Sequence, residues 1–309
     1  AARGHRAPRG LSPVTAARPA AHRHAALRRI RFDAALCRNR QSFPRDHPSA
    51  VRDCLFAYGF DIGTPAAGDQ TEFFESAVGA LRAVTDEAGA SLIPVWTNLR
   101  HLDPDGRAWP TEWYGLAAAS IAHALAPRLS RVLLAGGLDV GRLMPAGGHP
   151  MLDPYFGSAG LQVVHDGAHL SRVEKMRLVA DWDVAIQNVR VCWAGIQTGG
   201  PFNCGRCHKC LLTMMGLVAL SRLDRALSFP VREVTPAMLG DLRLDNPYLP
   251  TFYRELIAPL EAVGRRDLTR VIEAKIREHD RAAMSADDGA QRLARSFGRA
   301  LGRLARHFT

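Results

Sequence analysis

The chain has 309 residues, of which 47% are hydrophobic and 23% are charged, so it has enough apolar material for one large domain or two modest ones. Six cysteines, 19 scattered prolines and the lack of any internal repeat exclude a disulfide scaffold, a collagen-like array, a coiled coil and a repeat protein. No apolar run approaches about twenty residues, and no apolar core follows the first arginines, so we expect neither a membrane span nor a secretory signal.

The basic character of the chain is concentrated at its beginning. The formal net charge is +10, and residues 1–35 carry eight arginines and one aspartate, which leaves only +3 for the rest of the chain. This segment is rich in Ala, Arg, His and Pro and has neither helical nor strand periodicity. Its composition predicts a disordered basic arm. A nucleic-acid partner is the less favoured alternative, because most of the excess charge belongs to this segment.

The genetic code offers a second interpretation of the same segment. Residues 27–33 can be encoded as CTC CGG CGG ATT CGA TTC GAC, and the same letters shifted by one base read Ser-Gly-Gly-Phe-Asp-Ser. Because synonymous codons exist, the amino-acid sequence does not determine which of these codons the gene uses. A disordered arm and an out-of-frame translation therefore both stay open for residues 1–35.

From about residue 36 the chain alternates between strand and helix patterns. Short apolar runs predict strands at 51–60, 92–96, 131–135 and 161–164. Apolar or amphipathic periodicity predicts helices at 72–88, 113–126 and 171–180, and the last one opens with the Ser-x-x-Glu spacing of a capping box. Strands separated by helices indicate βαβ units and a parallel sheet, in which ligands bind beyond the carboxyl ends of the strands.

Four cysteines form the most specific local pattern. Cys192, Cys204, Cys207 and Cys210 give the string Cys-x11-Cys-x2-Cys-x2-Cys, which is typical of a metal site rather than of disulfides. A closed set of four thiolates predicts a structural zinc ion that fixes the start of a helix at 209–223. An iron–sulfur cluster, which uses similar spacing, is the alternative.

The cysteine string, the strand that ends at residues 56–59 and the βαβ order resemble the PP-loop (N-type) ATP pyrophosphatases, with a likeness to 7-cyano-7-deazaguanine synthases and to an uncharacterised bacterial branch related to them. The resemblance covers roughly residues 36–225. It implies a Rossmann-like (HUP-type) α/β fold, with a parallel sheet that has helices on both faces and a helical C-terminal region stapled by Zn²⁺. It also implies a cytoplasmic ligase that uses ATP and Mg²⁺, adenylates a small-molecule carboxylate, releases pyrophosphate and forms a C–N bond.

The chain departs from this family in one motif, because no Ser-Gly-Gly-x-Asp-Ser phosphate loop occurs in it as written. The family places this loop one helix before the strand at 51–60, which is where the shifted reading puts it. We therefore divide the chain into the segment 1–35, a nucleotide-binding domain at 36–190 that lacks its first strand and phosphate loop, and the zinc site and helices at 191–309. We expect ATP binding to be impaired, and a tRNA-modifying relative or a non-catalytic nucleotide-fold protein is the alternative.

The candidate site residues follow from the strand ends and from the resemblance. The nucleotide side is expected to include Tyr58, Asp61, Arg100, Gly136 and Gly137. The substrate side is expected to include His149, Asp153, His165, Asp166, Arg172 and Lys175. Each of them also has an ordinary interpretation as a turn residue, a solvated loop or a solvated helix face. No catalytic residue is assigned, and a homodimer stays open.

The C-terminal part offers no further motif. Helical patterns occur at 236–242 and 268–278. Residues 293–308 combine leucines and phenylalanines with arginines at helical spacing, which predicts a basic amphipathic helix. Docking on the domain is the favoured role for this helix, and an anionic membrane or RNA is the alternative.

Overall fold

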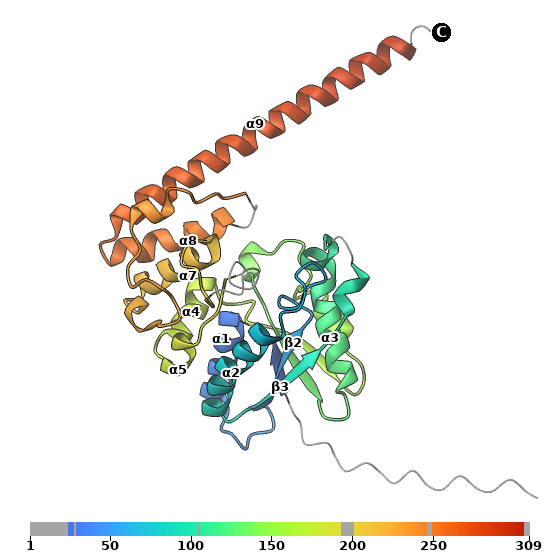
Figure 1. The fold of residues 1–309 in the computed structure, drawn as a ribbon. Helices are drawn as coiled ribbons and strands as arrows, with labels where there is room; N and C mark the ends of the chain where they lie inside the picture. Colours follow the sequence, from blue (N-terminus) through green and yellow to red (C-terminus); the bar gives the residue numbers. More distant parts are fainter. Residues whose placement is uncertain (1–23, 28, 104–105, 193–200, 246–248, 306–309) are drawn as a thin grey trace, which may run out of the picture.

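The structure is a computed structural model that describes residues 24–27, 29–103, 106–192, 201–245 and 249–305, with side chains for those between 31 and 285. The described part is a mixed α/β fold with one five-stranded sheet in the order β3-β2-β1-β4-β5, in which every neighbouring pair is parallel (Figure 1). Its strands are β1 (His24–Leu27), β2 (Val51–Tyr58), β3 (Ser91–Trp96), β4 (Arg131–Ala135) and β5 (Gln162–Asp166).

Helices make up most of the remaining described residues. The α-helices are α1 (Arg29–Ser42), α2 (Thr71–Ala88), α3 (Tyr114–Ala124), α4 (Arg172–Ala180), α5 (Asp183–Gln187), α7 (His208–Ala219), α8 (Leu249–Ala262) and α9 (Arg266–Ala305). The short helical turns are η1 (Leu99–Leu102), η2 (Trp109–Trp113), η3 (Val140–Arg142), η4 (Asp153–Phe156), η5 (Leu223–Arg225) and η6 (Pro236–Leu239). The strands expected after residue 50 are confirmed, and η6 is shorter than the helix expected at 236–242.

The expectation that residues 1–35 lack structure is wrong for the end of this segment. The strand β1 occupies the centre of the sheet, where His24 pairs with Val51 of β2 and with Arg131 of β4. The helix α1 begins two residues after it, at Arg29. A four-residue strand between two others takes its hydrogen bonds from both neighbours, so pairing rather than its own apolar pattern determines it. Residues 1–23 lie outside the described part.

Alternate side chains of the central strands enter two different apolar clusters. Val132 and Leu134 of β4 pack in a cluster with α3, whereas Leu133 packs in a cluster with residues of α1, α2, α4 and α5. This alternation follows from the two-residue repeat of a strand, which sends successive side chains to opposite faces. The sheet is therefore buried along its central strands.

The local signals that start and stop the helices agree with the sequence. Ser171 and Glu174 form the expected capping box at the start of α4, in which Ser171 N donates to Glu174 Oε2 at 2.7 Å and Glu174 N donates to Ser171 Oγ at 3.2 Å. Gly89 ends α2 in the left-handed conformation, with φ at 69°. The expected helix at 113–126 begins one residue later, because the single π-turn of η2 precedes α3.

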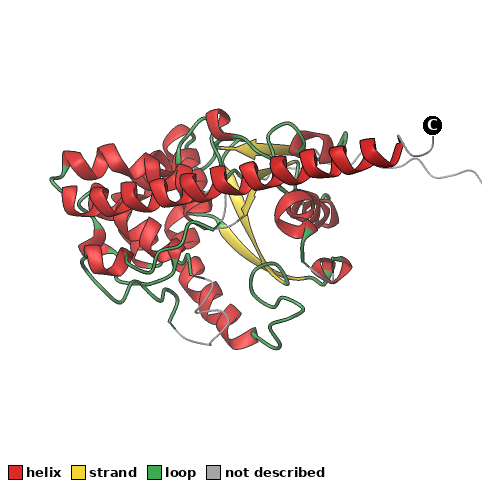
Figure 2. Cartoon of the chain, turned by 90° about the horizontal axis from the view of Figure 1, so that it is seen from above, coloured by secondary structure: helices red, strands yellow, loops and turns green. Residues whose placement is uncertain are grey.

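The C-terminal helices form a second core beside the sheet. Tyr253 and Leu256 of α8 pack with Leu268 and Ile272 of α9 and with α7, and the Tyr253 hydroxyl donates to His208 O at 3.0 Å. The helix α9 continues beyond this core and leaves the body of the molecule (Figures 1 and 2). The basic amphipathic segment expected at 293–308 falls on this extension, and its side chains lie outside the described part. No helix among the described residues is long and apolar enough to cross a membrane.

Candidate functional site

The four cysteines of the string come together in one cluster. Their sulfur atoms all lie within 4.8 Å of one another, with 3.8 Å between Cys192 and Cys207 and 3.9 Å between Cys204 and Cys210. A zinc–sulfur bond of about 2.3 Å implies sulfur–sulfur edges of about 3.8 Å in a tetrahedron, so the cluster has the size that a zinc ion requires. The four cysteines could therefore hold a metal such as zinc.

Backbone groups and electrostatics prepare this cluster for a cation. Gly205 adopts a φ of 72°, and this turn lets Arg206 N and Cys207 N donate to Cys204 Sγ at 3.5 and 3.3 Å. Hydrogen bonding with the neighbouring thiols, Cys210 first, lowers the pKa of Cys207. A sulfur that is already a thiolate at neutral pH is a ready metal ligand.

A buried asparagine that the sequence analysis missed holds the cysteine segment in place. Asn203 is fully buried and accepts from Val191 N at 2.9 Å, while its amide donates to Val189 O at 2.8 Å and to Ser228 O at 3.2 Å. It thus ties the segment before Cys192 to the segment before Cys204. An amide directly before a metal-binding cysteine was the available signal.

The expected nucleotide-side residues at the end of β2 serve local structure. The Tyr58 hydroxyl accepts from Gln70 N at 3.2 Å, and its ring fills the space that a side chain at Gly63 would need. Asp61 is buried in the same turn. Arg100 donates to Phe60 O and lies 4.9 Å from the ring centre of Trp109. The contacts of Tyr58 and Arg100 thus join the segments that follow β2 and β3.

A different group gathers where β4 ends. Gly136 N donates to Asp166 O at 2.7 Å, and Gly136 O accepts from the Lys175 ammonium at 3.0 Å. A β-carbon on Gly136 would overlap His165 Nε2, and one on Gly137 would overlap the guanidinium of Arg31. A side chain at Gly136 would also meet the backbone at Asp166 O, so glycine is required there, whereas one at Gly137 would force the Arg31 guanidinium to move.

The expected substrate-side residues His149, Asp153 and His165 also come together. His165 Nδ1 lies 2.6 Å from Asp153 Oδ2, and both side chains are almost completely buried. Asp153 Oδ1 accepts from His149 N at 3.0 Å. The carboxylate thus fixes the loop before η4 to β5 and orients the imidazole, whose Nε2 faces Gly136. Asp166, the next residue of β5, instead pairs with Arg38 of α1.

Arg172 and Lys175 meet a third cation at this edge of the sheet. Arg172 Nη2 donates to Thr213 Oγ1 at 3.1 Å, and burial lowers its pKa to about 10. Burial first, and the positive charge of Arg31 second, lower the pKa of Lys175 to about 8. Arg31 lies in the first turn of α1, within the segment expected to be disordered, so the sequence analysis did not place it in the site.

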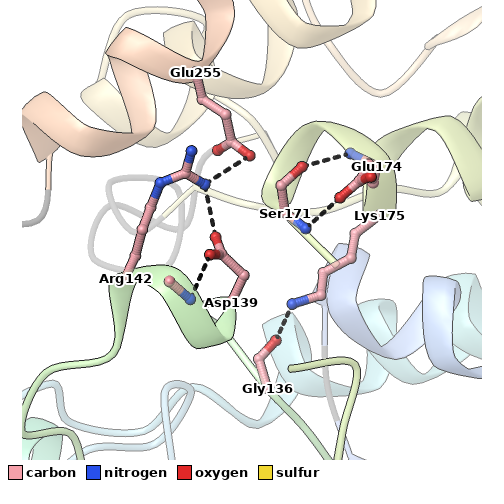
Figure 3. A network of polar contacts seen from close by, with 8 residues as sticks. Gly136, Asp139, Arg142, Ser171, Glu174, Lys175 and Glu255 are labelled. Atoms are coloured by element: carbon pink, nitrogen blue, oxygen red, sulfur yellow. Dashed lines mark hydrogen bonds and ion pairs between the residues drawn. The ribbon is translucent and has the colours of Figure 1, made fainter. Parts of the chain in front are cut away.

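Two acidic residues, Asp139 and Glu255 of α8, lie beside these cations. Arg142 Nη1 lies 2.6 Å from Asp139 Oδ2 and 3.3 Å from Glu255 Oε1, while the Lys175 ammonium points at Gly136 (Figure 3). Glu255 therefore brings the C-terminal helices to the carboxyl edge of the sheet. No motif in its helix signalled this role.

Comparison with known proteins gives no relative for this chain: no protein-family profile, curated protein or solved structure matches it.

Proposed function

We propose that the chain has a Rossmann-like (HUP-type) nucleotide-binding sheet with helices on both faces, of the PP-loop ATP pyrophosphatase type, and a structural zinc ion on its four cysteines. The intact form would adenylate a small-molecule carboxylate with ATP and Mg²⁺ and form a C–N bond. The observation that carries the proposal is the place of residues 29–33. They form the start of α1, directly after the central strand β1, and the strand order reverses between β1 and β4.

This place is where open α/β sheets bind phosphate groups. The chain passes from β1 to β2 and β3 on one side and to β4 and β5 on the other, so the reversal lies between β1 and β4. Ligands of such sheets bind beyond the carboxyl ends of the strands at the reversal, and helix N-termini favour phosphates there. The one-base shift puts Ser-Gly-Gly-Phe-Asp-Ser at this junction.

The residues present do not form the phosphate cradle that ATP needs. The segment has no glycine, and the Arg31 guanidinium occupies the space above Gly137. Arginine side chains supply charge but cannot replace a ring of preorganised backbone N–H groups. We therefore propose that the chain as written binds ATP poorly and turns nothing over, and we derive no catalytic step for it. A non-catalytic nucleotide-fold protein is the second candidate, and it is favoured by the same arginine.

Calorimetric titration with Mg·ATP tests the proposal. The chain is compared with a variant in which residues 28–33 become Ser-Gly-Gly-Phe-Asp-Ser and with a control in which the two glycines of that loop become alanines. We expect the glycine loop to raise the affinity by at least about a hundredfold and the control to restore much less. Equal affinity in all three would refute the loop assignment.

Sequencing the coding DNA across codons 20–36 provides an independent test. A reading frame that contains the loop supports the enzyme. An intact frame that matches the present sequence supports the non-catalytic candidate.

A further inference from the structure

Three cations at the carboxyl edge of the sheet form no direct ion pair with a carboxylate among the described residues. Lys175 is 3% exposed, and its ammonium group donates a hydrogen bond to a neutral carbonyl, Gly136 O. Arg172 donates to the neutral Thr213 hydroxyl, and its Nε atom is buried with no acceptor. Buried charges in proteins are normally paired or hold a ligand, because desolvation without compensation is costly.

These side chains, Arg31, Arg172 and Lys175, form a group that we call the three-cation cluster. Arg172 and Lys175 are one turn apart on α4, so they lie on the same side of that helix. The Arg31 guanidinium lies against Gly137, next to the carbonyl that binds Lys175. Burial first, and the positive charge of Arg31 second, lower the pKa of both Arg172 and Lys175, in agreement with a place for Arg31 near each of them.

The nearby acids compensate this charge only in part. Asp139 is engaged by Arg142 at 2.6 Å. Both carboxylate oxygens of Glu255 are buried without a hydrogen bond, and its ion pair with Arg142 is loose at 3.3 Å (Figure 3). Asp166, the third carboxylate near Lys175, is paired with Arg38. Five cations thus face three carboxylates, which leaves an excess of two positive charges in a largely buried place.

We propose that the three-cation cluster binds a small oxyanion of the phosphate or pyrophosphate class and that Glu255 is the internal counter-ion which this ligand displaces. A ligand with two negative charges matches the excess, and guanidinium groups bind phosphate oxygens with paired hydrogen bonds. Glu255 is suited to displacement because no hydrogen bond holds its carboxylate. The inference concerns the same edge of the sheet as the proposed function, but it needs neither a nucleotide nor the phosphate loop.

Thermal unfolding and calorimetry of the full chain with inorganic pyrophosphate test this inference at pH 7. Orthophosphate and Mg·ATP form parallel arms, and sodium chloride of the same ionic strength is the reference. We expect pyrophosphate and orthophosphate to stabilise the chain beyond the chloride reference, with little added by the nucleoside part of ATP. This order of ligands separates a site for the anion from a site for a nucleotide.

Variants locate the site. The Glu255→Gln variant keeps its shape and loses one negative charge, so we expect about tenfold tighter pyrophosphate binding. Lys175→Met and Arg172→Met are expected to weaken it at least about tenfold, and Arg177→Met, which changes an exposed cation of the same helix, should leave it unchanged. Circular dichroism shows whether each variant is folded.

Three results would overturn the inference: no stabilisation beyond the chloride reference, equal losses in Arg177→Met and Lys175→Met, or unchanged or weaker binding in Glu255→Gln. If Lys175→Met does not fold, Glu255→Gln alone decides. Pyrophosphate binding by the present chain without ATP binding by the loop-restored variant would refute the proposed function and leave this inference standing. The reverse pattern would refute this inference alone.

Discussion

Replacing Cys207 by serine removes one of the four sulfur ligands and leaves the other three in place. Structural zinc binds such sites with an apparent free energy of about 12 kcal/mol at neutral pH, so one ligand in four corresponds to about 3 kcal/mol. This equals a loss of about a hundredfold in zinc affinity. Cys192 and Cys210 are fully buried in the core that α7 shares with α8, so the loss should loosen these helices.

Metal analysis and hydrogen exchange measure both effects. We expect one zinc per chain in the purified protein, competitive chelation at about a hundredfold lower chelator concentration in Cys207→Ser, and faster amide exchange in α7 and α8 than in β2. Cys37→Ser is the matched control, because Cys37 lies on α1, outside the cluster, and a hydroxyl can keep its hydrogen bond to Leu178 O. Iron in place of zinc, no metal at all, or equal exchange changes in α7 and β2 would refute this reasoning.

Three further predictions concern the sheet and its edge. Gly136→Ala should destabilise the chain by about 2 kcal/mol in denaturant unfolding, because its β-carbon would overlap the buried imidazole of β5, whereas Gly160→Ala has open space and should change little. Arg128→Met removes two hydrogen bonds, at 2.9 and 2.7 Å, from the fully buried carboxylate of Asp53. We expect the free energy of unfolding to fall by about 3 kcal/mol, and a fall below about 1 kcal/mol would contradict this. Burial lowers the pKa of Lys175 to about 8, so the charged form of this side chain opposes folding. Relative to Lys175→Met, the free energy of unfolding should therefore rise by about 3 kcal/mol between pH 8 and 10.5. A difference between the two proteins that does not change with pH would refute the lowered pKa of Lys175.

The features that sequence reasoning predicted are those that short-range patterns encode. The capping box at Ser171 and Glu174 depends on residues three apart, and the apolar runs of β2 and β4 are buried because the sheet is covered at its centre. The two-residue spacings between Cys204, Cys207 and Cys210 likewise keep these three cysteines close together. In each case the spacing along the chain nearly determines the spacing in space.

The features that it missed depend on contacts between distant segments. Glu255 reaches Arg142 only because α8 packs beside the sheet, and nothing in the helix sequence marks that contact. Arg31 belongs to a segment whose composition suggests disorder, and its place is determined by the pairing of β1 with two other strands. Tyr58 and Arg100 also make contacts that the sequence did not indicate, because they hydrogen-bond to neighbouring loops at the strand ends; their place in a nucleotide site stays a prediction.

The central strand β1 has a consequence for how the chain assembles. Its four residues are the described link between the pair β2–β3 and the pair β4–β5, and His24 meets its β4 partner, Arg131, across more than a hundred residues of sequence. Such distant pairing forms late, because loop closure must precede it. Until β1 is inserted, β2 and β4 each expose an unpaired inner edge, and unpaired edges recruit strands of other chains. The shortest strand of the sheet thus decides whether this chain folds alone or joins its copies during synthesis.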